Sequence, residues 1–515
     1  KEIDGKELAE INYDQLLKYA TPKVGEAFKV LLADFVTTED GTGIVHLAPS
    51  FGADDSIVAK QNGIGSLTLV DEQGRFTEEV TDFKGQYVKN EYYNENEKMP
   101  KLSADVQIAI KLKEEGLLFK SEKYEHSYPH CWRTDKPILY YPLDSWFIKT
   151  TDHKKRMIEL NKTINWKPRS TGEGRFGNWL ENLVDWNLSR SRFWGIPLPI
   201  WRTEDKKEEL CIGSVEELKN EIDRAVEFGF MKNNPLENFT PNNYSDNNYN
   251  IFDLHRPQVD NIILASPGGK KMMRELDLID VWFDSGSMPY AQLHYPFENK
   301  SIFEKQFPAD FIAEGVDQTR GWFFTLHAIS TLLFNSVAYK NVISNGLVLD
   351  KNGNKMSKRL GNAVDPFKTI NLYGADATRW YMISNAQPWD NLKFDEEGIV
   401  EVKRKFFGTL YNTYSFYALY ANIDNFNYEE EKQPINKREK IDKWIISEMN
   451  SLIKEVESFY EDYEPTKAAR AIQNFVINKL SNWYIRLNRR RFWKGEYNYD
   501  KKNAYCTLFE CLKDI

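Results

Sequence analysis

Residues 309–350 alternate between strand and helix patterns, and this order limits the fold more than any other feature of the sequence. The run ADFIAEG (309–315) precedes TRGWFFTLHAISTLLF (319–334), which precedes NVISNGLVLD (341–350). A strand, a helix and a strand in this order predict a parallel sheet with a right-handed crossover. The second half of the chain therefore contains an α/β domain.

Other segments differ from this core in their pattern of apolar and polar residues. The segment EKIDKWIISEMNSLIKEVESFYEDY (439–463) has a clear helical period, and the chain after about 430 is expected to be helical. The segment 101–119 predicts an amphipathic helix that ends at Gly116. The segment 41–55 predicts a glycine turn, a buried strand and an acidic loop. The Asn- and Pro-rich segment 233–250 predicts a surface insertion.

Length and composition place the chain among globular cytoplasmic proteins. At 515 residues it is too long for one core, and about three or four domains are expected. No apolar run approaches the roughly 20 residues of a membrane span, and the polar N-terminus lacks a signal-peptide core. Four cysteines make no disulfide framework, so a reducing cytoplasm is the expected location.

A basic loop, NGNKMSKRLGN (352–362), stands out because the chain carries 68 Lys and Arg against 77 Asp and Glu, a net charge of −9. A polyanion can therefore bind only through local basic patches. No Walker A motif or strand-linked GxGxxG occurs. Cations on a glycine-rich turn after a strand suit a triphosphate. A solvated turn with surface lysines is the alternative.

The loop resembles the KMSKS signature of the class I aminoacyl-tRNA synthetases. The matching residues are Lys355, Met356, Ser357, Lys358 and Arg359, and the last replaces the more common serine. The resemblance implies that the loop binds the phosphates of ATP and stabilises the transition state of amino-acid activation. It makes Lys358 the principal catalytic residue, supported by Lys355 and Ser357.

A second motif, AEGVDQTRGWFF (313–324), places polar residues where a parallel strand ends. Ligands bind at that edge of α/β sheets, and acids there could hold an ammonium group or ribose hydroxyls. A helix cap with a salt bridge is the alternative. The motif resembles EGxDQxRGW of the isoleucyl, valyl and leucyl enzymes. That resemblance assigns adenylate contacts to Glu314, Gly315, Asp317 and Gln318.

The same resemblance assigns further contacts around this motif. Trp282, in DVWFDSGSMPYAQ (280–292), and Trp322 match the tryptophans that wall the side-chain pocket. Packing in the core is the alternative for both. Asn345 and Gly346 stand where many relatives have His-Gly beside the adenine.

Two segments interleave arginine with aromatic residues, a pattern that suits RNA. The first is WNLSRSRFWGIPLPIW (186–201), for which the alternative to RNA binding is a layer of arginine and aromatic side chains packed inside the protein. LSNWYIRLNRRRFW (480–493) resembles the helical anticodon-binding domain of isoleucyl enzymes. The tRNA-binding residues implied there are Arg486, Arg489, Arg490 and Arg491.

The first third resembles a proofreading domain. A hydrophobic pocket separates isoleucine from valine poorly, and these enzymes are the standard example of a second, hydrolytic site. GTGIVHLAPSFGADD (41–55) resembles the C-terminal part of that editing domain. The resemblance places His46 in the editing pocket and makes Asp55 the acid that holds the α-amino group. Without the resemblance, the interpretation of His46 is a core histidine whose ring nitrogens are hydrogen-bonded inside the protein.

The whole chain resembles the isoleucyl-tRNA synthetases, in a eukaryotic-like form. The HIGH motif and the threonine-rich wall of the editing pocket are missing, so the chain is expected to be an inactive internal fragment. The implied protein is a cytoplasmic monomer that uses ATP and Mg²⁺ to join isoleucine to tRNA(Ile) and hydrolyses mischarged valine. The alternatives are a valyl enzyme, a tRNA-binding scaffold without ligase activity, or a nucleotide-binding protein without a tRNA role.

The expected fold is α/β and multidomain. It combines the second half of a Rossmann-type core, part of a mixed α/β-barrel editing domain and a helical anticodon-binding domain.

The cluster of His126, His130 and Cys131 offers three zinc ligands where a structural site needs four. A polar turn is therefore favoured, and the sequence leaves open whether the protein binds zinc. The domain boundaries are 1–150 (editing), 151–275 (return to the core with an insertion), 276–362 (Rossmann half with the basic loop), 363–430 (stem contact) and 431–515 (anticodon binding).

Overall fold

The computed structural model describes residues 3–39, 42–123, 125–357, 361–430 and 433–515. The predicted Lys358 and Arg359 lie outside the described residues. The chain divides into two compact units, Lys1–Asp144 and Ser145–Ile515.

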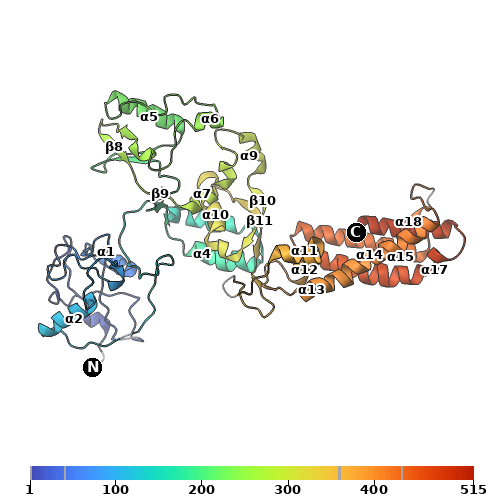
Figure 1. The fold of residues 1–515 in the computed structure, drawn as a ribbon, viewed down its shortest axis with the longest axis horizontal. Coiled ribbons are helices and arrows are strands. Elements are labelled where there is room, and N and C mark those ends of the chain that lie inside the picture. The colour runs from blue at the N-terminus through green and yellow to red at the C-terminus, as the bar shows by residue number, and fades with distance from the viewer. Residues whose placement is uncertain (1–2, 40–41, 124, 358–360, 431–432) are drawn as a thin grey trace. The chain divides into compact units, whose positions relative to one another are not determined.

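The first unit has short helices joined by long irregular segments (Figure 1). Its described residues pair only in isolated bridges, such as Asn12 with Lys29 and Val70 with Phe76. The buried strand predicted within 41–55 is wrong: residues 44–48 form no strand, and Val45 is exposed. No strand in the described part of this unit lies beside them to supply the hydrogen bonds of a ladder. The helices of this unit are η1 (Gly5–Leu8), α1 (Ala53–Gln61), η2 (Asn90–Tyr92) and α2 (Ala104–Glu114).

Helix α2 confirms the helix predicted within 101–119. It is followed by Gly116 at φ +70°, the left-handed conformation that ends many helices and that glycine adopts without a Cβ clash.

A three-stranded parallel sheet forms the core of the second unit, as the strand–helix–strand order predicts. Its strands are β2 (Asn165–Lys167), β10 (Ala309–Gly315) and β11 (Tyr339–Asn345), in the order β10-β11-β2. Helix α10 (Trp322–Phe334) crosses over between β10 and β11. It is apolar on nearly all sides and packs into the same core as Trp166 and Val342.

Short elements surround this core (Figure 1). Helix α7 (Val281–Gly286) packs against α10, and η6 (Val316–Arg320) leads into it. Two antiparallel strand pairs, β1 with β3 and β4 with β9, lie in the connections. The other elements are β1 (Phe147–Ile148), η3 (Thr150–His153), α3 (Lys154–Asn161), η4 (Thr171–Phe176), α4 (Gly177–Glu181), β3 (Trp186–Asn187), β4 (Ser189–Arg190), β9 (Leu278–Ile279), α8 (Met288–Ala291) and α9 (Lys300–Gln306).

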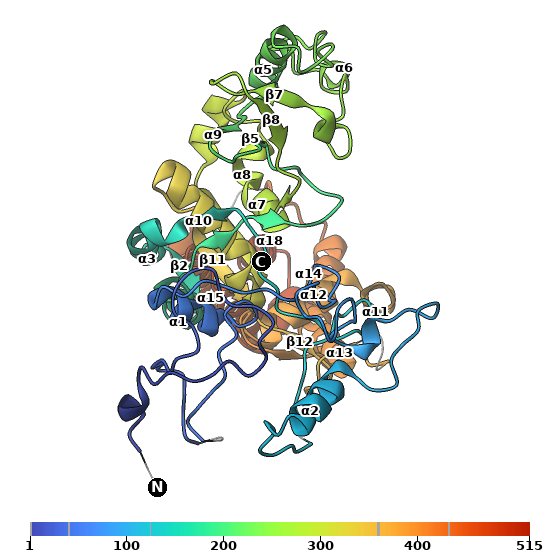
Figure 2. The ribbon, with the colours of Figure 1, turned by 90° about the vertical axis from the view of Figure 1, so that its left-hand side faces the viewer.

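An inserted α/β module has its own core. Figure 2 shows helix α5 (Val215–Glu227) beside the strands of an antiparallel sheet in the order β6-β5-β8-β7. Most residues of the segment 233–250 are exposed, as its composition predicts for a surface insertion, but Leu236 and Phe239 anchor the segment in this core. The remaining elements are β5 (Ile200–Thr203), β6 (Glu209–Cys211), α6 (Asp246–Tyr249), η5 (Val259–Asn261), β7 (Ile263–Ala265) and β8 (Lys271–Arg274).

The C-terminal part is helical, as predicted. Helix α15 (Lys440–Glu461) buries Ile445, Met449 and Leu452 on one stripe, and it packs against α16 and α18 in the helical part of Figure 1. The other elements from residue 348 onward are β12 (Val348–Leu349), α11 (Pro366–Tyr373), α12 (Ala375–Asn385), β13 (Leu392–Lys393), α13 (Glu396–Val402), η8 (Lys403–Phe407), α14 (Gly408–Ile423), η9 (Ile435–Lys437), α16 (Pro465–Asn474), η10 (Phe475–Ile485), α17 (Arg486–Trp493) and α18 (Tyr499–Asp514).

No helix among the described residues is long and apolar enough to cross a membrane.

Candidate active site and nucleic-acid surface

The predicted adenylate residues meet at one edge of the parallel sheet. Glu314 of β10 lies opposite Ser344 of β11, and Gly315 lies opposite Asn345. Because both strands run in the same direction, their carboxyl ends reach the same edge. The sheet therefore brings Glu314, Gly315 and Asn345 together, and Gly346 follows directly.

Gln318 links this edge to helix α10. Its Oε1 accepts a hydrogen bond from the backbone N–H of Trp322 at 3.0 Å, and its Nε2 donates to the Asp317 carboxylate at 3.0 Å. The amide is thereby fixed in one orientation, while Asp317 and Glu314 stay exposed. The alternative of an acidic helix cap with a salt bridge is not what the described residues show: the side chain that accepts from the first turn of α10 is the Gln318 amide, and both carboxylates stay available to a ligand.

The two predicted pocket tryptophans lie around Gly321: Trp322 begins α10, and Trp282 belongs to α7. Trp282 is 41% exposed, and a Cβ added at Gly321 would lie 3.2 Å from its ring and 2.8 Å from Gln318 Oε1. Trp322 is half-buried and donates from Nε1 to the Ser285 carbonyl at 2.8 Å. Both rings are held close to Gly321, and Trp282 is too exposed for a purely core residue.

Asp280 orients Trp282, and sequence reasoning missed it. Its carboxylate accepts from the Trp282 backbone N–H at 3.2 Å, from Arg190 at 2.7 Å and from Trp186 Nε1 at 3.1 Å. A buried acid needs such partners. An acid one residue before an apolar helix start is a capping signal that could have identified it.

Gly346 lies where no side chain fits. A Cβ there would be 2.5 Å from the Asp390 carbonyl oxygen and 2.9 Å from that of Trp389. The Gly346 N–H donates to the Pro388 carbonyl at 2.9 Å, and the Leu347 N–H donates to Asn391 Oδ1 at 2.8 Å. The segment after β11 is therefore seated directly on residues 388–391.

Asp350 and Asn362 fasten the base of the basic loop. The Asp350 carboxylate accepts from the N–H of Asn354 at 2.8 Å and from Asn362 Nδ2 at 3.0 Å. These hydrogen bonds, first that of the Asn354 backbone, hold the pKa of Asp350 below its ordinary value. Asn362 Oδ1 accepts from the Ser357 N–H at 2.8 Å. These bonds join the described ends of the loop, where Lys355 is exposed, and sequence reasoning missed both clasp residues.

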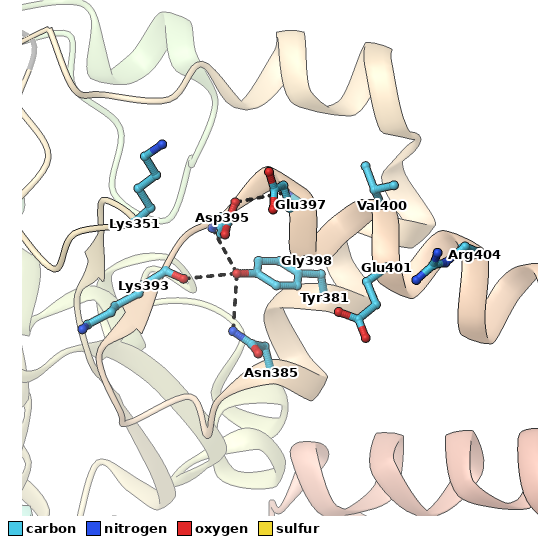
Figure 3. A pocket seen from close by; sticks show the side chains of 10 residues that line it. All are labelled: Lys351, Tyr381, Asn385, Lys393, Asp395, Glu397, Gly398, Val400, Glu401 and Arg404. Carbon is cyan, nitrogen blue, oxygen red and sulfur yellow. Dashed lines mark hydrogen bonds between the residues drawn. The ribbon is translucent and has the colours of Figure 1, made fainter.

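A cavity of about 660 Å³ lies beside the loop base, not at the strand edge (Figure 3). Among the lining side chains, the Tyr381 hydroxyl donates to the Lys393 carbonyl at 3.1 Å and accepts from the Asp395 N–H at 3.1 Å. Its walls mix both charges and it is widely open. The lining residues are Lys351, Tyr381, Asn385, Lys393, Asp395, Glu397, Gly398, Val400, Glu401 and Arg404.

The predicted editing residues lie in the first unit. Asp55 stands in the first turn of α1, and its Oδ2 accepts from the Ala48 N–H at 2.9 Å. His46 is exposed, so the interpretation as a satisfied core histidine is wrong. The structure places both on the segment 46–55.

The arginines of α17 divide into two groups. Arg486, Arg489 and Arg490 are exposed. The side chain of Arg491 is only 16% exposed and pairs with Asp442 at 2.8 Å and Asp500 at 2.7 Å. Arg491 thus has structural partners, and a tRNA contact for it stays a prediction.

The segment 186–201 also divides. Trp186 and Trp201 are buried, as the packing alternative expects. Phe193 and Trp194 are exposed, and Trp194 stacks on His255 at 4.8 Å between ring centroids.

Among the described residues, no three or more His, Cys, Asp or Glu side chains are grouped so that they could hold a metal ion. His130 and Cys131 therefore belong to no such group.

Comparison with known proteins adds two family matches. Residues 77–395 match the model of the tRNA synthetases class I (I, L, M and V), and residues 442–515 match the anticodon-binding domain of tRNA ligase.

Individual proteins are similar as well. The chain is 64% identical to the isoleucine–tRNA ligase of Cytophaga hutchinsonii over 99% of this chain and 46% of that protein. It is 60% identical to that of Bacteroides fragilis over 100% of this chain and 48% of that protein. The chain thus spans about half the length of these relatives. A structure of Mycobacterium tuberculosis methionyl-tRNA synthetase in complex with methionyl-adenylate matches 75% of this chain and 62% of that chain, with a TM-score of 0.51 and 16% identity.

Proposed function

Because the chain belongs to the class I tRNA synthetases of the I, L, M and V group, we propose that the whole protein is an isoleucine–tRNA ligase. One observation carries the choice of isoleucine: ligases for this amino acid match the chain over essentially its full length at up to 64% identity. The eukaryotic-like form, the monomeric state and the cytoplasmic location stay predictions.

At the sheet edge, the exposed carboxylates of Glu314 and Asp317 offer anchors for the ammonium group of isoleucine or the ribose hydroxyls of the adenylate. Gln318 holds Asp317 in place. Trp282 and Trp322 lie beside Gly321 and present apolar ring surface to the branched side chain. Asn345 and Gly346 end the neighbouring strand, where the adenine would lie.

The basic loop supplies positively charged side chains that stabilise the transition state. As the isoleucine carboxylate attacks the α-phosphate, charge develops on the leaving pyrophosphate, and Lys355 and Lys358 would stabilise it. Ser357 is held at the loop base by Asn362. Mg²⁺ would enter with ATP, because this ion is commonly bound through substrate phosphates and few protein carboxylates.

The remaining parts serve tRNA and proofreading in this proposal. The exposed arginines of α17 contact the phosphates of tRNA(Ile). Asp55 and His46 contribute to an editing pocket that hydrolyses mischarged valine.

ATP–pyrophosphate exchange by the full-length protein tests the assignment. We expect strong exchange with isoleucine, weaker exchange with valine and little with leucine. The variant Lys358→Ala should lower the isoleucine rate by about two to three orders of magnitude, as the loss of a transition-state contact does. A protein that activates valine better than isoleucine would be the valyl enzyme, and the proposal would be wrong.

A further inference from the structure

The turn between α15 and α16 is attached to the parallel sheet. This turn, 462–464, belongs to the helical part of the chain, while its partners Lys167 and Phe311 belong to β2 and β10. Nothing in the sequence signals the contact, because about 150 to 300 residues separate the partners.

Lys167 forms the polar half of this contact. Its Nζ donates to Asp462 at 2.8 Å and to Glu464 at 3.3 Å. The Glu464 side chain is 10% exposed, and its second carboxylate oxygen is buried without a hydrogen-bond partner. Lys467, at 3.4 Å, is the other cation beside it. The buried charge therefore depends on a lysine of the sheet, since a buried carboxylate is stable only when paired.

Tyr463 forms the apolar half. Its ring stacks on Phe311 with 4.9 Å between centroids and 8° between planes. Tyr463 has φ +55° directly after the C-cap of α15, and the Glu464 N–H returns to the Phe459 carbonyl at 2.8 Å. Glycine is the usual residue at this position of a helix end, and a bulky residue is strained there. The stacking of its ring on the sheet offsets this strain.

The contact lies close to the candidate active site along the chain. Phe311 precedes Glu314 by three residues on β10. Helix α16, which begins after Glu464, donates from Thr466 to the Ile383 carbonyl at 2.7 Å and from Arg470 to the Ser384 carbonyl at 2.8 Å. These bonds satisfy the end of α12. The same turn thus joins the helical part both to the adenylate strand and to the helix after the basic loop.

We infer that Tyr463 and Lys167 are positioning residues that hold the tRNA-binding helices in register with the adenylate strand during transfer of isoleucine to tRNA. This inference rests on the proposed function. Activation of isoleucine uses only the sheet edge and the basic loop, so it does not need the contact. Transfer needs the tRNA to reach that edge in one orientation, and small misplacements of a reacting group cost large factors in rate.

The variant Tyr463→Gly in the full-length protein gives the sharpest test. It removes the ring and relieves the strain, and these two changes have opposite effects on the thermal unfolding midpoint. If the ring only stabilises the fold, exchange and aminoacylation should both stay normal. We expect an unchanged midpoint, isoleucine-dependent ATP–pyrophosphate exchange within about twofold of wild type, and kcat for aminoacylation of tRNA(Ile) about tenfold lower with little change in the KM for tRNA.

Four further variants complete the design. Tyr463→Phe keeps the ring and should charge tRNA normally. Lys167→Met should reproduce the loss, and Lys167→Arg should restore much of it. Lys340→Met removes an exposed ion pair with Asp310 on the same sheet and should change nothing.

Normal aminoacylation by Tyr463→Gly would overturn the inference, as would an equal loss of exchange and aminoacylation. A wild-type protein that neither exchanges with isoleucine nor charges tRNA(Ile) would instead overturn the proposed function. The two failures are therefore distinguishable.

Discussion

Adjacent arginines on α17 have different surroundings. Arg490 is exposed, whereas Arg491 reaches back to Asp442, a carboxylate with no exposed surface that also accepts from the Tyr484 hydroxyl at 2.7 Å. The sequence shows three arginines in a row, and no pattern in it tells which one turns inward. That distinction depends on Asp442, 49 residues away.

Replacing Arg491 by alanine should therefore destabilise the helical part. The change leaves the buried Asp442 charge unpaired, and such losses cost about 3–5 kcal/mol. Denaturant unfolding followed by circular dichroism measures it. Arg490→Ala is the matched control and should stay within about 0.5 kcal/mol of wild type. A stable Arg491→Ala variant would contradict the structural role.

Replacing Arg490 by alanine should instead weaken tRNA binding at unchanged stability. One phosphate contact fewer lowers the slope of log affinity against log salt by about 1. Filter binding of full-length protein and tRNA(Ile) at several salt concentrations measures this slope. A slope equal to that of wild type would remove Arg490 from the proposed tRNA surface.

Asn362 should matter for activation although it touches no substrate in the proposal. Asn362→Ala removes the acceptor of the Ser357 N–H and the donor to Asp350, so the loop loses its clasp. We expect ATP–pyrophosphate exchange to fall about tenfold, with an unchanged circular-dichroism spectrum. Asn352→Ala is the control, because Asn352 gives the clasp only its backbone N–H. Equal rates for the two variants would argue against the clasp.

At the scale of elements, the secondary structure of long segments with many apolar residues could be predicted from the sequence. That of segments with few apolar residues could not. The order β10, α10, β11 follows from apolar runs bounded by turns, and α15 follows from its period. The segment around Val45 looks equally apolar, yet it forms no strand because a strand needs a neighbour. Leu236 and Phe239 are buried although polar residues dominate 233–250, since two anchors suffice to fix a loop on a sheet. Of the candidate site, the residues at the strand ends followed from the motif, whereas Asp280, Asp350 and Asn362 required the fold.

Helix α10 should make the second unit sensitive to acid through His327. Complete burial lowers the pKa of His327 to about 4, and its Nε2 faces the Met157 carbonyl at 2.9 Å. Unfolded histidine titrates near 6.5, so the stabilisation is complete above that pH and is lost as the pH falls toward 4. The loss between pH 7 and pH 5 is about 2 kcal/mol.

Denaturant unfolding at pH 7, 6 and 5 tests this prediction. His327→Gln keeps a donor for the Met157 carbonyl but does not titrate, so its stability should fall by about 2 kcal/mol less over this range. The same pH dependence in both proteins would show that His327 does not cause it.

At the scale of the molecule, residues 1–515 contain the sheet edge and the loop base but no HIGH motif. We expect this chain alone to bind tRNA(Ile) in a salt-dependent manner and to show no isoleucine-dependent ATP–pyrophosphate exchange. Filter binding and the exchange assay, run on one preparation, test both statements. Measurable exchange would show that the HIGH motif is dispensable here.

Strand β10 has one further consequence for anyone who purifies this chain. In the described part of the chain it pairs along one side only, with β11, and its seven residues lack proline and lysine. An open strand edge of this length can recruit a strand from another molecule. Solution work on the chain therefore calls for low protein concentration and for a check by light scattering at each step. A soluble peptide that caps the edge of β10 is a rational additive for crystallisation.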